Sequence, residues 1–240
     1  MLTTDLHAHF LFATDDGPRT LEESLRMTRL AAADGVQDVY CTSHLDTEDK
    51  VAAVLADRKM KREALQQAAA AEGLSVTFHR GAEWMLTPEM VEVLPETPEG
   101  WLGNSRAFLF EISAYHPFSV VPMAVKATAA RGLKPLFAHP ERYRQLATTD
   151  AAAALMPVVA AGAALQLTAA SFTGLFGSRA EKLAWAILDA FPEDVVLASD
   201  AHESEVRVPG LARAAALIEK KRPGAVARME KRMAALLTTA

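Results

Sequence analysis

Histidine, aspartate and glutamate residues recur along this sequence in short motifs whose chemistry suits metal binding. They are His7, His9, Asp16, His44, Glu83, Glu111, His139, Asp200 and His202. His7 and His9 are two residues apart, so in an extended strand both imidazoles project from one face and can bind one ion. The nitrogen and oxygen donors, without sulfur, suit Mn, Fe or Zn at a catalytic site better than Ca. Since these ligands are too many for one ion, we expect two or three divalent ions, with a carboxylate such as Glu83 as a bridge.

Each of these residues alone also has an ordinary structural interpretation. A single histidine at a strand end is more often a core or surface residue, and Asp15-Asp16 before Gly17 is typical of a turn. Five of the seven histidines, however, follow successive predicted strands. We expect the other two, His79 and His116, to be structural or rim residues. The combined pattern therefore favours a metal site.

The elements that must position these residues alternate between short β-like runs and longer helical runs. This alternation is typical of parallel strands joined by crossover helices. The predicted strands are 4–7, 38–42, 75–80, 107–112, 135–139, 164–167 and 195–199. Helices are expected over 51–71, 122–130, 149–161, 179–191, 209–220 and 224–237, after a first one capped by Thr20 and Glu23. The segment 88–103 is expected to be an irregular loop. Nearly every strand ends in a His, Asp or Glu, which favours a barrel over an open sheet with one switch point.

The composition limits the class of protein. With 240 residues, 50% hydrophobic and 23% charged, the chain fits one globular domain over residues 1–240. A formal net charge of -5 argues against a nucleic-acid partner. The single cysteine excludes an internal disulfide and, with no secretory signal at the N-terminus, favours a cytoplasmic location. The uncharged stretch 151–178 is broken by Pro157, Gly162 and Gln166, so we expect no membrane span.

The ordered motifs resemble those of the polymerase and histidinol phosphatase (PHP) superfamily. The motifs are His7-Ala-His9, Asp15-Asp-Gly-Pro18, Thr42-Ser-His44, Gly81-Ala-Glu83, Ala138-His-Pro-Glu-Arg-Tyr143 and Ser199-Asp-Ala-His202. The segments 16–24 and 166–177 resemble one branch, the bacterial manganese-dependent protein-tyrosine phosphatases encoded with capsule and exopolysaccharide genes. The resemblance runs from Asp5 to about Ala215, which is nearly the whole chain.

The resemblance implies an α/β fold, a distorted (β/α)7 TIM-like barrel, with three divalent ions in its cleft. Manganese is expected, with iron and zinc as alternatives. It assigns His7, His9, Glu83 and Asp200 to one ion, Glu83, Glu111 and His139 to a second, and Asp16, His44 and His202 to the third. It also makes Arg142 and Arg207 phosphate-binding residues.

The activity that the resemblance implies is hydrolysis of phosphotyrosine monoesters by a metal-activated hydroxide. The expected partner is a phosphotyrosine protein, a bacterial tyrosine autokinase of polysaccharide synthesis. Three alternatives stay open: a small-molecule phosphomonoesterase such as a histidinol phosphatase, a weakly catalytic module that docks a phosphorylated kinase tail, and a nuclease or proofreading domain. The acidic composition disfavours the last of these.

Further expectations concern the charge of the site, the role of the single cysteine and the aromatic residues. Four carboxylates would repel a phosphate ester, whereas three divalent ions together with the arginines reverse the sign of the site. The cysteine-dependent phosphatase mechanism needs an arginine at a fixed distance after its nucleophile, which Cys41 lacks, so Cys41 is expected to be a buried strand residue. Five aromatic residues either line the cleft or pack inside: Trp84, Trp101, Tyr115, Phe118 and Phe176.

Overall fold

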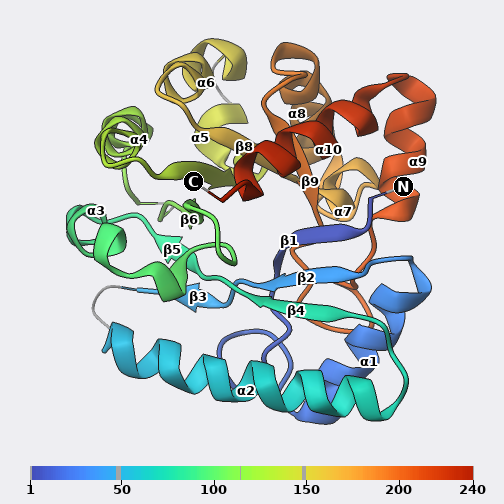
Figure 1. Ribbon diagram of the computed structural model, residues 1–240. Helices are drawn as coiled ribbons and strands as arrows, with labels where there is room; N and C mark the ends of the chain where they lie inside the picture. The colour runs from blue at the N-terminus through green and yellow to red at the C-terminus, as the bar shows by residue number, and fades with distance from the viewer. Residues whose placement is uncertain (1, 47–49, 114, 148–149, 240) are drawn as a thin grey trace.

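The strands of the protein run parallel to their neighbours in each sheet (Figure 1). The computed structural model describes residues 2–46, 50–113, 115–147 and 150–239. Met1 and Ala240, the ends of the expected domain, and Thr149, the expected start of a helix, lie outside the described residues. Its strands are β1 (Thr4–Ala8), β2 (Asp38–Cys41), β3 (His44–Leu45), β4 (Thr77–Arg80), β5 (Glu83–Met85), β6 (Ala107–Glu111), β7 (Lys134–Ala138), β8 (Ala164–Thr168) and β9 (Val195–Ala198).

Helices connect the strands and cover their outer faces. They are α1 (Leu21–Ala33), α2 (Val51–Ala71), α3 (Pro88–Val93), α4 (Val121–Ala130), α5 (Arg144–Ala147), α6 (Ala151–Ala160), α7 (Ala169–Phe172), α8 (Gly177–Ala190), α9 (Ala212–Lys221) and α10 (Ala225–Leu237). Figure 1 shows α2 lying along β4, with α1 beside it. At α1 the predicted capping box is confirmed: Thr20 Oγ1 accepts from Glu23 N, and the Glu23 carboxylate accepts from Thr20 N.

The strands form two sheets in the orders β1-β2-β4 and β3-β5-β6-β7-β8-β9, with every pair parallel. The sheets are linked where the chain passes from β4 to β5, since Glu83 N donates to Thr42 O at 3.1 Å. They are linked again between β1 and the end of β9, where His9 N donates to Ala201 O at 2.8 Å and Asp200 N to His7 O at 2.7 Å. The predicted α/β class with parallel strands is therefore confirmed.

The seven predicted strands are present with small shifts of their ends, but β3 and β5 were not predicted. The expectation of an irregular loop over 88–103 is wrong in its first part, where α3 forms. Thr87 caps this helix by accepting from Met90 N, and Pro88 occupies a first-turn position in which its missing N–H costs nothing. Met90 is buried and anchors the short helix to the core.

The core is made largely by strands whose two faces are both buried. Ala107 to Phe110 of β6 are all buried, as are all five residues of β8. This pattern is typical of parallel strands covered by helices. Within the described residues, no helix is both long and apolar enough to span a membrane. The uncharged stretch 151–178 forms α6, β8, α7 and the beginning of α8.

Candidate metal centre

All nine predicted ligands converge at the ends of the strands. His7 lies in β1 and His9 directly after it, Asp16 lies in the loop before α1, and His44 and Glu83 are the first residues of β3 and β5. Glu111 is the last residue of β6, His139 directly follows β7, and Asp200 and His202 follow β9. Every one of the nine belongs to at least one group whose possible ligand atoms all lie within 4.8 Å of one another.

The inner triad consists of His7, His139 and Asp200, all of which are buried. His7 Nε2 lies 3.2 Å from Asp200 Oδ1 and 3.2 Å from Glu83 Oε2. His139 Nε2 lies 2.9 Å from the other oxygen of Glu83. The two imidazoles of the inner triad thus face Asp200 and the neighbouring Glu83, away from solvent.

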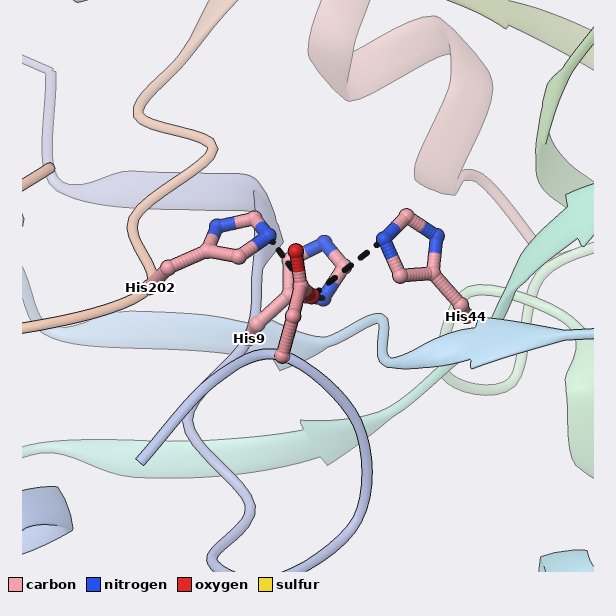
Figure 2. A group of neighbouring side chains, drawn as sticks. His9, His44 and His202 are labelled. Carbon is pink, nitrogen blue, oxygen red and sulfur yellow. Dashed lines mark ion pairs between the residues drawn. The ribbon is translucent and has the colours of Figure 1, made fainter. Parts of the chain in front are cut away.

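The outer cluster consists of His9, Asp16, His44 and His202. Figure 2 shows the imidazoles of His9, His44 and His202 close together, with dashed lines for the ion pairs that His44 and His202 make with Asp16. Asp16 Oδ1 lies 3.1 Å from His202 Nε2 and 3.4 Å from His44 Nε2. The side chains of Asp16 and His44 are 59% and 39% exposed, so the outer cluster opens to solvent.

Glu83 and His44 connect the inner triad with the outer cluster. Glu83 Oε2 lies between 3.1 and 3.3 Å from nitrogens of His7, His9 and His44. His44 Nδ1 also lies 3.0 Å from Glu111 Oε1. The two residues face each other because β3 and β5 pair with His44 opposite Glu83. Their short strands therefore set the centre of the site.

The histidines and carboxylates perturb one another strongly. Burial alone would lower the pKa of His7, but the carboxylates of Glu83 and Asp200 outweigh it and raise the pKa to about 9. Burial alone would likewise raise the pKa of Glu83, yet the imidazoles of His7, His139 and His44 hold that pKa well below its usual range. His202 and His44 lower the pKa of Asp16. The carboxylates of Glu83 and Asp16 are therefore held in the ionised form that a metal cation requires.

Several buried side-chain atoms of the site that could bind a metal ion make no hydrogen bond among the described residues. Glu83 Oε2 and His202 Nε2 are two of them, although each lies close to a group of opposite type. Unpaired buried polar atoms are costly, and a cation coordinated by them would remove that cost. The donor set of imidazole nitrogens and carboxylate oxygens matches what Mn, Fe and Zn ions take. The residues present therefore fit divalent metal ions.

The backbone is unusual at two residues of the inner triad. His139 has φ of 34° and Asp200 has φ of 52°, the left-handed region that non-glycine residues seldom adopt. Such conformations cost about 1–3 kcal/mol each and persist where the surrounding structure enforces them. Asp200 is enforced by its N–H bond to His7 O, and His139 by its N–H bond to Gln166 Oε1 at 3.0 Å.

The two predicted phosphate-binding arginines lie at the edge of the inner triad. Arg142 Nη1 and Arg207 Nη2 both donate to Oδ2 of Asp200, the latter at 2.7 Å, while Oδ1 faces His7. Phe176 supports both guanidinium groups, with its ring centroid 4.7 Å from Arg142 and 5.9 Å from Arg207. The Arg142 and Arg207 side chains are 29% and 24% exposed, so both can reach a ligand.

The five aromatic residues divide between the two interpretations. Trp84 is fully buried and its indole N–H donates to Gly100 O, so it is a packing residue. The Trp101 indole N–H similarly donates to Leu94 O, and Phe118 is packed against the core. Tyr115 is 97% exposed. Phe176 packs against Arg142 and Arg207, so among these five aromatic residues it is the one for which the structure gives a contact with predicted site residues.

Three residues that support the site were not predicted from the sequence. Asp15 accepts from the ring of His9, and Gln166 accepts from the ring of His7. Glu141 is buried and accepts from Thr168 N and Ser171 Oγ, which anchors the turn that carries Arg142. The only available signal was their position inside or beside the motifs, and it did not identify their partners.

The expectation for Cys41 is confirmed, since the residue is buried in β2. Burial raises the pKa of its thiol to about 12. A thiol in this state holds almost no thiolate at neutral pH and is a poor nucleophile.

Sequence comparisons relate the chain to bacterial phosphatases. The family model described as "Capsular polysaccharide synthesis, CpsB/CapC" matches residues 3–232. Tyrosine-protein phosphatase CpsB of Streptococcus agalactiae serotype III (strain NEM316) is 28% identical over 224 residues, 89% of this chain and 88% of the relative. Tyrosine-protein phosphatase YwqE of Bacillus subtilis (strain 168) is 29% identical over 212 residues, 85% of this chain and 78% of the relative.

A solved structure has the same fold over almost the whole chain. It comes from the crystal structures of YwqE from Bacillus subtilis and CpsB from Streptococcus pneumoniae, described as unique metal-dependent tyrosine phosphatases. The TM-score is 0.85 at 23% identity, and the match covers 99% of this chain and 95% of the other. The resemblance inferred from the motifs is confirmed, and the chain belongs to the capsular polysaccharide synthesis CpsB/CapC family.

Proposed function

We propose that this protein is a metal-dependent protein-tyrosine phosphatase that hydrolyses phosphotyrosine monoesters. The observation that carries the proposal is that nine residues of metal-ligand type lie together and that two arginines donate to one of them, Asp200. The names of the relatives support the substrate class, since CpsB and YwqE are both called tyrosine-protein phosphatases.

The nine predicted ligands hold three divalent ions, with manganese first and iron or zinc as alternatives. His7, His139 and Asp200 on one side, and Asp16, His44 and His202 on the other, supply most of the donors, and Glu83, Glu111 and His9 lie between them. When bound, the ions supply Lewis acidity and lower the pKa of coordinated water from 15.7 toward 7.

The chain's own residues bind and orient the phosphate. Arg142 and Arg207 present guanidinium groups that match phosphate oxygens in charge and geometry. The Phe176 ring packs against both guanidinium groups, and Asp200 holds them beside the predicted metal ligands. Arg142 and Arg207 therefore neutralise the phosphoryl oxygens as the ester bond breaks.

The remaining parts of the proposal concern fold closure and setting. The links between β1 and β9 and between β4 and β5 support a distorted (β/α)7 barrel formed by residues 1–240 as one domain. The family description, capsular polysaccharide synthesis, supports a bacterial tyrosine autokinase of that process as the partner. The single, buried cysteine supports a cytoplasmic location.

The test combines elemental analysis with activity on three substrates. Wild-type protein purified without chelator should contain divalent metal, and with added manganese it should hydrolyse an aryl phosphate and a phosphotyrosine peptide. His44→Ala removes a residue that contacts Asp16, Glu83 and Glu111, and it should lose metal and at least about 10²-fold in activity. His79→Ala is the matched control, because His79 contacts Asp38 instead of a predicted ligand.

Histidinol phosphate is the third substrate and separates the closest alternative. Faster turnover of histidinol phosphate than of the phosphopeptide would replace the proposal by a small-molecule phosphomonoesterase. Metal-loaded protein that binds the phosphopeptide tightly without hydrolysis would replace it by a docking module.

A further inference from the structure

Asp15 is a carboxylate beside the predicted ligands that no metal assignment uses. Its side chain is 7% exposed, and it makes three contacts with segments that carry ligands. Oδ2 lies 2.7 Å from His9 Nδ1 and accepts from His44 N at 3.0 Å, while Oδ1 accepts from Gly17 N at 3.0 Å. Asp15 therefore connects His9, the Asp16 loop and β3.

The loop around Asp15 is built for close approach. A Cβ at Gly17 would lie 2.8 Å from His9 O and 3.1 Å from Asp15 Oδ1, so a side chain there would push the loop away. A glycine at this position lets the loop close on His9. The contacts of Asp15 thus depend on a local backbone arrangement that only glycine permits.

The contact with His9 determines which ring nitrogen is free. An ionised carboxylate can only accept, so His9 Nδ1 must donate its hydrogen to Asp15. Nε2 of His9 then carries the free lone pair, and this atom lies 3.3 Å from both His7 Nε2 and Glu83 Oε2. Metal-binding histidines depend on such a partner for their tautomer and ring orientation.

We infer that Asp15 is a positioning residue, which holds His9 with Nε2 toward the metal centre and fixes the backbone of His44 beside it. The inference rests on the proposed metal-dependent function. Asp15 itself donates no ligand atom; it acts through two residues that do.

The chain contains a second histidine–carboxylate pair that serves as a control. His79 Nε2 lies 2.6 Å from Asp38 Oδ1, a contact of the same chemistry between β4 and β2. His79 and Asp38 are partly exposed and belong to none of the ligand groups. Removing the charge of Asp38 therefore reproduces the chemical change at Asp15 without touching the centre.

The experiment compares full-length wild type, Asp15→Asn and Asp38→Asn. Manganese affinity is measured by electron paramagnetic resonance titration of metal-free protein, and the His9 ring is followed by ¹⁵N NMR of the zinc-loaded protein. Asparagine keeps the size of the side chain but has no charge and only one acceptor oxygen, so it cannot accept from His9, His44 and Gly17 as Asp15 does. We therefore expect the Kd for manganese to rise about 10- to 100-fold. The ¹⁵N shifts of His9 should change in the same variant. Asp38→Asn should keep the wild-type Kd within about twofold.

The outcomes separate the inference from the proposed function. If wild type binds neither manganese nor zinc up to millimolar concentration, the proposed function fails. If wild type binds manganese and Asp15→Asn binds it equally well, with unchanged His9 shifts, the inference alone is overturned. If Asp15→Asn does not fold, Asp15→Ser, which leaves Nδ1 to water, takes its place; a Kd equal to that of wild type in this variant overturns the inference as well.

Discussion

The inner triad and the outer cluster use the same ligand types but are supported differently. His7, His139 and Asp200 are buried at the ends of β1, β7 and β9. Hydrogen bonds between strand ends fix them, including Asp200 N to His7 O and His139 N to Gln166 Oε1. The inner triad is therefore held by the sheet itself.

Two residues of the outer cluster, Asp16 and His44, lie on segments outside the longer strands. Asp16 lies in a loop, His44 begins a strand of two residues, and both side chains are partly exposed. The supports are individual side chains: Asp15 holds His44 N, and Arg58 donates to the carbonyls of Ser43 and His44. The comparison teaches that one half of the site is fixed by the fold and the other half by a few polar contacts.

The largest effect is expected at the residue that both halves share. Glu83→Gln removes the charge that faces His7, His9 and His44 together, and we expect phosphatase activity to fall by about 10³-fold and the retained metal to fall as well. The measurement is aryl-phosphate turnover with metal content of the same sample. Glu99→Gln changes an exposed carboxylate that belongs to none of the ligand groups; it is the control and should behave as wild type. Equal loss in both variants would contradict the central place of Glu83.

The next effect breaks the inner triad alone. Gln166 Oε1 accepts from both His7 Nδ1 and His139 N at 3.0 Å, so Gln166→Leu should weaken metal binding about 10- to 100-fold. Gln166→Glu keeps an acceptor there, and Gln166 Nε2 makes no hydrogen bond that could be lost. The glutamate variant should therefore stay within a few-fold of wild type in calorimetric titration with manganese. A leucine variant with wild-type affinity would show that the sheet suffices without this amide.

A smaller effect concerns the pH dependence of metal binding through His7 in the inner triad. Without metal, His7 with its pKa of about 9 is protonated at neutral pH, and an ion that takes Nε2 must displace this proton. Metal affinity should therefore rise with pH, by up to tenfold per unit for each proton displaced, and the share that belongs to His7 should end above about pH 9. Neighbouring carboxylates also raise the pKa of His9 and His44, so these imidazoles release protons on metal binding as well. Proton release follows from titrations in two buffers of different ionisation enthalpy. Release that does not decline as the pH passes 9 would contradict the assignment to His7.

The same proton also affects the metal-free fold. Because the folded-state pKa of His7 is raised from its ordinary 6.5, the stability it contributes is fully present below about pH 6.5 and is lost as the pH rises through about 9. Thermal unfolding of metal-free protein across this range should show the decline, and His7→Gln should remove it.

The smallest effect is expected at Cys41. The thiol is buried and its pKa is raised to about 12, so iodoacetamide should leave activity unchanged under native conditions. EDTA in a parallel sample should abolish activity, and manganese should restore it. Sensitivity to the thiol reagent together with resistance to EDTA would contradict a metal-dependent reaction.

The inner triad was easier to predict than its supports, for a physical reason. His7 lies near the end of β1, and His139 and Asp200 follow β7 and β9. These strands are long enough for the pattern of apolar residues to be read, and each of the three residues lies in a short motif. Strands β3 and β5, with two and three residues, are too short for any periodicity, and their pairing arises only from the sheet around them. Gln166 and His7 are 159 positions apart, so their hydrogen bond has no local trace in the sequence.

The left-handed backbone at His139 and Asp200 sets a limit on how this fold can be improved. Glycine would relax either position and make the empty scaffold more robust, yet it would delete an imidazole or a carboxylate that no neighbour can replace. Selection for thermal stability therefore favours glycine at these two positions, whereas selection for turnover favours histidine and aspartate. A laboratory evolution experiment that selects for thermal stability alone would favour a more stable but inactive protein.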